Sequence, residues 1–112
     1  MSYEPGAGDI TITLSGESVA LKPTLEACIR ISRATKSGPR GLADQVLSLD
    51  FDAVCLVVSA GTGRKLEDVQ KAVFETGTIN IFGDCIRFIE IVNNGGRPPK
   101  QEEKAADPLP VG

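Results

Sequence analysis

The N-terminal part of the chain alternates between apolar and polar residues. Ile10, Ile12 and Leu14 are separated by threonines, and the alternation resumes at Val19 and Leu21 after a Ser-Gly-Glu turn. Period-two alternation rich in β-branched residues on both sides of a glycine turn is typical of a β-hairpin. Because an isolated hairpin is only marginally stable in water, we expect its apolar face to pack against the helices that follow.

After the second strand the apolar residues follow helical spacing instead. Thr24 is a good N-cap, and we predict a helix from there to about residue 35, with Leu25, Cys28 and Ile29 at helical spacing. The sequence KSGPRG then interrupts the pattern. A short second helix is predicted to begin near residue 39 or 41 and to carry Leu42, Val46 and Leu49.

The stretch FDAVCLVVSA, residues 51–60, is apolar on most sides and therefore fits either a helix or a buried strand. We favour a helix, because Asp50 can cap its N-terminus and Gly61 stands where a left-handed residue would end it. A further helix is predicted from about Leu66 to Gly77, with Glu67 and Asp68 suited to its first turn.

The last predicted helix is capped by Thr78 and ends at Gly95 or Gly96. Its apolar residues form one band, which consists of Ile79, Phe82, Cys85, Ile86, Ile89 and Val92 and which Ile81, Phe88 and Ile91 widen. A helix that is apolar around so much of its circumference lies at the centre of the core or against a partner. The candidate partner-binding residues are Ile79, Phe82, Ile86 and Ile89. Simple core packing is the alternative interpretation of this band.

Together these elements predict an α+β, mainly α, fold with an N-terminal β-hairpin followed by four to five short helices. A chain of 112 residues with 41% hydrophobic residues is sufficient for one domain with a modest core. We place this compact domain at residues 9–95. Residues 1–8 are expected to form a flexible N-terminus, and the Pro-rich, charged residues 96–112 a disordered tail.

Charge and hydropathy then narrow the classes of partner. The formal net charge is −3 and basic residues are not clustered on any predicted helix, so we expect no nucleic-acid binding. No apolar stretch approaches the roughly 20 residues that a membrane-spanning helix needs. The N-terminal sequence lacks the basic and apolar regions of a signal peptide, so synthesis and residence in the cytoplasm are expected.

The side chains offer little catalytic chemistry. The sequence has no histidine, which removes the usual general base and the usual partner of a serine or cysteine nucleophile. Cys28, Cys55 and Cys85 are far apart and lack CxxC spacing, so we interpret them as small buried hydrophobic residues and not as zinc ligands. We expect no enzymatic activity and no catalytic, cofactor-binding or metal-binding residues.

The sequence VVSAGTGRKLEDV, which begins at Val57, superficially resembles a phosphate-binding loop. A P-loop requires G-x-x-x-x-G-K-[ST] between a strand and a helix. Here Gly61 and Gly63 are too close together, and Leu66 stands where a hydroxyl should follow Lys65. The stretch is better interpreted as a turn between two helices, and a small nucleotide-binding module remains a lesser alternative.

The order of the elements carries a family resemblance. GDITITLSGESVALKPTLEACIRI resembles a strand, turn and strand that lead through a Lys/Arg-Pro-Thr/Ser step into a helix. DFDAVCLVVSAGTGRKLEDVQKAVFETGTINIFGDCIRFI resembles an apolar helix that ends in Ala-Gly, then a helix that ends in Gly, then an apolar terminal helix. Over residues 9 to 93 this order is similar to the gene transfer agent and tailed-phage tail assembly proteins, a group that includes tail assembly chaperones and tail tube proteins.

The resemblance implies a function in tail assembly. Phage tail assembly chaperones coat the tape-measure protein and recruit tail tube subunits, then leave before the particle is complete. By this resemblance the partners would be the tape-measure protein and tail tube subunits, in the cytoplasm of a bacterial host, and self-association into a homo-oligomer remains open. The alternative is a structural tail subunit retained in the virion tail. A tube subunit should be mostly β-sandwich or barrel, whereas one hairpin followed by helices favours the chaperone.

Overall fold

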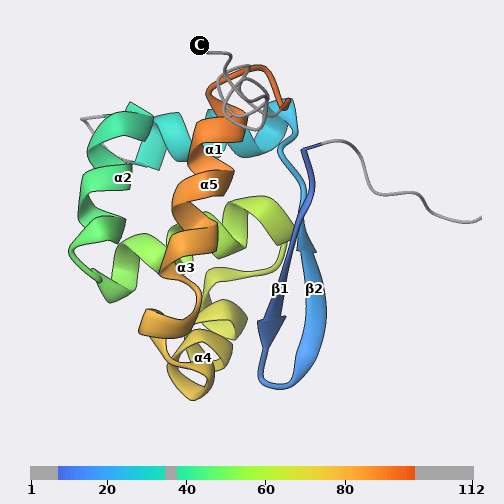
Figure 1. Ribbon diagram of the computed structural model, residues 1–112, viewed down its shortest axis with the longest axis vertical. Coiled ribbons are helices and arrows are strands. Elements are labelled where there is room, and N and C mark those ends of the chain that lie inside the picture. Colours follow the sequence, from blue (N-terminus) through green and yellow to red (C-terminus); the bar gives the residue numbers. More distant parts are fainter. Residues whose placement is uncertain (1–7, 35–37, 98–112) are drawn as a thin grey trace, which may run out of the picture.

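The computed structural model describes residues 8–34 and 38–97 and confirms the predicted α+β, mainly α, fold (Figure 1). Strands β1 (Ile10–Leu14) and β2 (Glu17–Leu21) form an antiparallel hairpin. The helical elements in the described part of the chain are α1 (Leu25–Ala34), α2 (Gly38–Leu47), α3 (Phe51–Thr62), α4 (Leu66–Thr76), the 3-10 helix η1 (Thr78–Asn80) and α5 (Phe82–Val92). Most of the predicted flexible N-terminus and disordered tail, residues 1–7 and 98–112, lies outside the described residues.

The hairpin follows the alternation in the sequence. Its two-residue loop, Ser15-Gly16, has positive φ at both positions, 50° and 82°, which the tight turns of twisted hairpins require. The apolar residues of both strands are buried and the threonines of β1 are exposed. The hairpin lies along one side of the helices (Figure 1), where β2 contacts α3 and β1 contacts α4 and α5.

Helix α3 is the centre of the fold, because it contacts β2 and each of α1, α2, α4 and α5. Residues 51–60 are helical, as predicted, and the central position of α3 buries most of their side chains. Asp50 caps the helix, since its Oδ1 accepts from Ala53 N–H at 3.1 Å. Thr24 caps α1 in the same way through Ala27 N–H, also at 3.1 Å. The predicted N-caps Thr24 and Asp50 are therefore confirmed.

The glycine that ends α3 was predicted wrongly. Gly63, with φ 79° and ψ 5°, is the left-handed residue, and its N–H donates to Ser59 O. Gly61 lies inside the last turn, where a Cβ would come within 3.0 Å of Leu21 and 3.1 Å of Phe88. Gly61 therefore allows α3 to approach the hairpin and α5 closely, and its carbonyl accepts from Lys22 N–H at 2.9 Å.

The buried faces of two helices also differ from the predicted ones. In α1, Ala27 and Ile31 are buried, whereas Leu25 and Ile29 of the predicted stripe are exposed. The predicted last helix is divided into η1 and α5, so Thr78 does not cap α5. Three residues of the predicted band, Ile79, Phe82 and Ile86, are not buried. The buried residues around this division come from the rest of the band and from the residues that widen it, and they are Ile81, Cys85, Phe88, Ile89, Ile91 and Val92.

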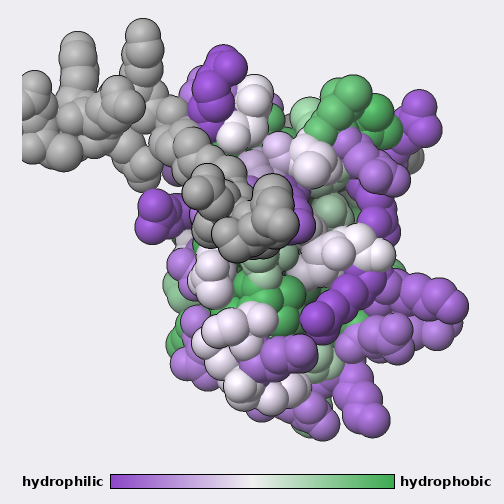
Figure 2. Space-filling model, turned by 90° about the vertical axis from the view of Figure 1, so that its right-hand side faces the viewer, coloured by the Kyte–Doolittle hydropathy of each residue, from purple (hydrophilic) through white to green (hydrophobic). Residues whose placement is uncertain are grey.

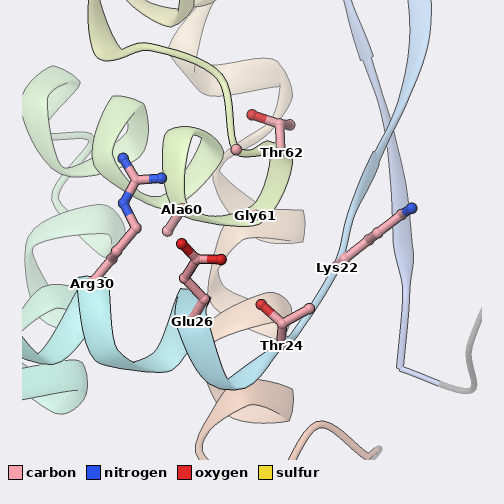
Figure 3. Close-up of a pocket in the computed structure, with 8 residues that line it drawn as sticks. Lys22, Thr24, Glu26, Arg30, Ala60, Gly61 and Thr62 are labelled. Carbon is pink, nitrogen blue, oxygen red and sulfur yellow. The ribbon is translucent and has the colours of Figure 1, made fainter.

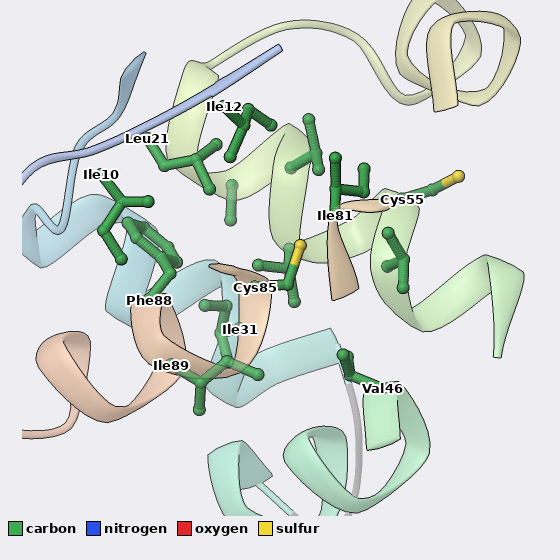
Figure 4. Packing of buried hydrophobic residues seen from close by; sticks show 14 of the residues in the cluster. Ile10, Ile12, Leu21, Ile31, Val46, Cys55, Ile81, Cys85, Phe88 and Ile89 are labelled. Atoms are coloured by element: carbon green, nitrogen blue, oxygen red, sulfur yellow. The ribbon is translucent and has the colours of Figure 1, made fainter. Parts of the chain in front are cut away.

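Phe88 is the largest fully buried side chain of the described residues. Figure 4 shows its ring beside Ile10 of β1, in a core to which the hairpin and the helices all contribute. The ring also lies against Gly61 of α3. Phe88 therefore connects α5, α3 and the hairpin, and these contacts hold the exposed surfaces described below in fixed positions.

Candidate functional site

Large apolar side chains are exposed where α4 ends and α5 begins. Phe74 of α4 is 78% exposed and Ile79 of η1 is 65% exposed. Phe82 and Ile86 of α5 are half-buried and pack on the edge of the core. Because η1 contacts both α4 and α5, these four residues come from adjoining segments, and we call them the η1 surface.

Local hydrogen bonds fix η1 in a position that turns Ile79 outward. Gly77, with φ 97°, ends α4 and donates its N–H to Val73 O at 2.8 Å. Asn80 then donates from Nδ2 to Thr76 O at 2.8 Å, which ties η1 back to the end of α4. In this tight turn Ile81 points into the core, where it is 3% exposed, while Ile79 points to solvent.

Charged residues lie close to the η1 surface, and most of them are acidic. Lys71 and Glu75 are exposed on α4 on either side of Phe74 in sequence, and Asp84 lies in the first turn of α5. Glu75 Oε1 accepts from the Ser15 hydroxyl at 2.8 Å, which also ties the hairpin to α4. An apolar surface bordered mostly by acidic residues is suited to a partner helix that carries apolar anchors and some basic residues.

The structure separates the four predicted partner-binding residues. Ile79 is exposed and Phe82 and Ile86 are half-buried, so these three remain candidates for contact. Ile89 is only 2% exposed and belongs to the core. Its burial leaves no surface for a partner in this conformation, and we omit it from the η1 surface.

Phe74 was missed by the sequence analysis, although the sequence contains a signal for it. The buried residues of α4 are Val69 and Val73, and Phe74 lies outside their helical stripe, between the charged residues Lys71 and Glu75. A large aromatic residue on an otherwise charged helix face is exposed at a cost in solvation. An aromatic residue among charged residues on one helix face would therefore have indicated Phe74 as an exposed contact residue.

A second exposed apolar site lies on α1. Leu25 and Ile29, one helical turn apart, are both exposed, and Leu25 lines a groove of about 190 Å³. The other residues that line the groove with Leu25 are Pro23, Thr24, Cys28, Val92, Gly95 and Gly96. It is smaller than the sites that usually hold small molecules, and the sequence did not predict it.

The turn between α3 and α4 is held by a partly buried polar network. Arg30 of α1 donates from Nη2 to Ser59 Oγ at 2.9 Å and from Nη1 to Ser59 O at 3.3 Å. The Ser59 hydroxyl in turn donates to Arg64 O at 2.8 Å. Arg30 and Ser59 therefore fix the end of α3. Ser59 is the only buried polar side chain among the described residues, and these hydrogen bonds compensate for its burial.

A polar pocket of about 300 Å³ opens beside this turn (Figure 3). Lys22, Thr24, Glu26 and Arg30 contribute side chains to it, and residues 60–63 at the end of α3 complete it. The carbonyl end of α3 carries partial negative charge, and Glu26 adds a carboxylate. Helix-loop-helix connectivity here differs from the strand-loop-helix of a P-loop. The pocket therefore gives little support to the nucleotide-binding alternative.

Burial determines the chemistry of two cysteines. Burial raises the pKa of Cys85 from 9.0 to about 12, with smaller contributions from Asp84 and Cys55. Burial, and then the charge of Asp52, raises the pKa of Cys55 to about 11. Both thiols are therefore protonated at neutral pH and are poor nucleophiles, as their interpretation as buried hydrophobic residues requires.

These shifts predict a loss of stability at alkaline pH. Well below pH 9 the thiols are protonated in the folded and unfolded states alike, whereas between pH 9 and about pH 11 they ionise mainly in the unfolded state. At pH 10 each thiol should lower the free energy of unfolding by roughly 1 kcal/mol. Urea denaturation at pH 8 and pH 10 measures the change. The variant Cys55→Ala/Cys85→Ala should lose less stability over this interval, and an equal loss in both proteins would contradict the assignment.

No helix in residues 8–34 and 38–97 is long and apolar enough to cross a membrane, and these residues contain no group of three potential metal ligands. Figure 2 views the hairpin side, which is largely hydrophilic, with hydrophobic residues in small separate groups.

Comparisons with protein-family models, curated proteins and solved structures found no match to this chain.

Proposed function

We propose that this protein is a tail assembly chaperone of a phage or gene transfer agent. It would bind the tape-measure protein in the bacterial cytoplasm and assist assembly of the tail tube. The observation that carries the proposal is the exposure of Phe74 and Ile79 on a small helical domain. The order of elements that resembles this family supports it as well.

The η1 surface suggests how the partner would bind. A tape-measure protein is a long helical chain, and an amphipathic helix can place its apolar residues against Phe74, Ile79 and the exposed parts of Phe82. Desolvation of these side chains supplies the free energy of binding. Acidic residues such as Glu75 would favour basic positions at the edge of the partner helix and set its orientation.

Co-expression tests this proposal. The tape-measure protein encoded beside this chain should be largely insoluble when produced alone, because its apolar helix faces are unpaired. Co-expression with this chain should move it into the soluble fraction, measured as the ratio of soluble to total protein. An unrelated small acidic protein expressed at the same level is the control. Equal solubility with the control and with this chain would count against the proposal.

A structural tail subunit is the second candidate, because a permanent interface would also use exposed apolar residues such as Phe74 and Ile79. The two candidates differ in the finished particle. A chaperone leaves before completion, so mass spectrometry of purified particles should find no stoichiometric amount of this chain. A copy number equal to that of known tail subunits would instead establish the structural alternative.

A further inference from the structure

The hairpin exposes the outer edge of β1. In its register Leu14 pairs with Glu17 across the two-residue loop, Thr13 with Ser18 and Thr11 with Ala20. The pair that closes such a loop is hydrogen-bonded, and hydrogen-bonded pairs alternate with non-hydrogen-bonded pairs along an antiparallel ladder. The backbone N–H and C=O groups of Thr11 and Thr13 therefore point away from β2.

Two observed hydrogen bonds support this orientation. Ser15, two residues after Thr13, donates its outward N–H to Thr76 Oγ1 at 2.7 Å. Lys22, two residues after Ala20 on the other strand, donates its outward N–H to Gly61 O at 2.9 Å. Within the described residues, no hydrogen bond outside the ladder engages Thr11 or Thr13. Along the outer edge of β1, the backbone of Ser15 is thus hydrogen-bonded to α4, whereas the outward backbone groups of Thr11 and Thr13 are available to a partner.

A groove runs beside this open edge. It has a volume of about 370 Å³, and its lining consists of Thr11, Ile12, Thr13, Thr76, Asn80, Ile81 and Asp84. Ile12 and Ile81 are buried and supply apolar surface, whereas Asp84 supplies a carboxylate. None of the residues that line the groove is basic. The groove therefore combines unpaired strand backbone, an apolar base and negative charge.

Proteins usually protect an exposed strand edge with lysine, proline, a bulge or a covering segment. The sequence of β1, ITITL, has no charged residue and no proline, and its register with β2 is continuous. Its β-branched residues favour the extended conformation. An edge with these properties readily pairs with another extended chain.

We propose that the outer edge of β1 is a strand-addition site for an extended segment of a partner protein. Antiparallel pairing with Thr11 and Thr13 forms four backbone hydrogen bonds. Apolar side chains of the segment lie toward Ile12 and Ile81, and a lysine or arginine lies beside Asp84. This site adjoins the η1 surface near Asp84 but uses other contact residues, and it does not depend on the proposed chaperone function.

The test uses a capped peptide, KTVTIK, as the extended segment, titrated into isotope-labelled full-length protein and followed by NMR. We expect saturable shifts centred on the amides of Thr11 and Thr13, together with slower hydrogen exchange at both. The same peptide N-methylated at alternate residues cannot form the backbone pairs and should bind at least about tenfold more weakly. Replacing its lysines by glutamate should weaken binding to a similar extent, and Asp84→Asn should reduce that difference.

A matched pair of protein variants tests the site itself. Thr13→Pro removes an outward N–H and leaves the ladder with β2 intact, because proline is tolerated on strand edges. It should weaken binding of the peptide about tenfold or more, whereas Ser18→Pro, at the paired position on the outer edge of β2, should not. If Thr13→Pro fails to fold, the N-methylated peptide provides the same comparison.

Three results would overturn the proposal. The first is the absence of shifts at Thr11 and Thr13 at the highest peptide concentration. The second is equal binding of the N-methylated and unmodified peptides. The third is concentration-dependent dimerisation of the protein, measured by analytical ultracentrifugation, that Thr13→Pro abolishes. That result would identify a second copy of this chain as the occupant of the edge.

Discussion

Replacing Phe88 by alanine is expected to lower the free energy of unfolding by about 3–5 kcal/mol. The ring is fully buried between α5, the last turn of α3 and the hairpin. Its removal leaves a cavity that Gly61, without a side chain, cannot fill. Because small domains are stable by only about 5–15 kcal/mol, this variant should unfold at much lower urea concentration or fail to fold.

Phe74→Ala is the matched control, since the same side chain is truncated where it is 78% exposed. Its free energy of unfolding should change by less than about 0.5 kcal/mol. Urea denaturation monitored by circular dichroism measures both variants. Equal effects of Phe88→Ala and Phe74→Ala would contradict the position of α5 in the core.

The second large effect concerns binding. The double variant Phe74→Ser/Ile79→Ser should weaken the complex with the tape-measure protein about 100-fold or more, because loss of a central apolar anchor typically costs at least about 2 kcal/mol. Both residues are exposed, so the unbound protein should keep its stability. Isothermal titration calorimetry measures the affinity, and urea denaturation checks the fold.

Leu47→Ser/Leu49→Ser is the control for this experiment. These two leucines are also exposed, at the end of α2 and just after it, so the substitution removes exposed apolar side chains elsewhere on the surface. Binding should be unchanged within about twofold. A loss of affinity in the control that matches the loss in Phe74→Ser/Ile79→Ser would show that the η1 surface has no special role.

Much of the fold could be predicted from local features of the sequence. The strict alternation around Ser15 and Gly16 fixed the strands and their turn, because a shift of one residue would move every apolar side chain to solvent. Thr24 and Asp50 marked helix starts correctly, because capping depends only on a side chain and the backbone three residues later.

Other features depended on tertiary contacts that a sequence pattern does not contain. Gly61 and Gly63 are both suitable for ending a helix, and the choice between them follows from the close approach of Leu21 and Phe88 to Gly61. In α1, Leu25 and Ile29 have the spacing of a buried stripe, but the neighbouring helices pack against Ala27 and Ile31. Periodicity identifies an apolar face without identifying what covers it.

The candidate site was predictable only in part for the same reason. A single continuous helix after Thr78 would place Ile79 and Ile89 on one face. The turn at η1 interrupts that helix, so Ile79 is exposed and Ile89 is buried. The outer edge of β1 could not be identified from the sequence, because it depends on which strand edge the helices leave open.

Reciprocal affinity purification of the co-expressed pair tests the central claim most directly. A tag on this chain should recover the tape-measure protein in stoichiometric amount, and a tag on the tape-measure protein should recover this chain. The variant Phe74→Ser/Ile79→Ser should lose the partner in both directions while remaining soluble. Failure of the unsubstituted pair to co-purify with either tag would contradict the proposal that this protein is a tail assembly chaperone.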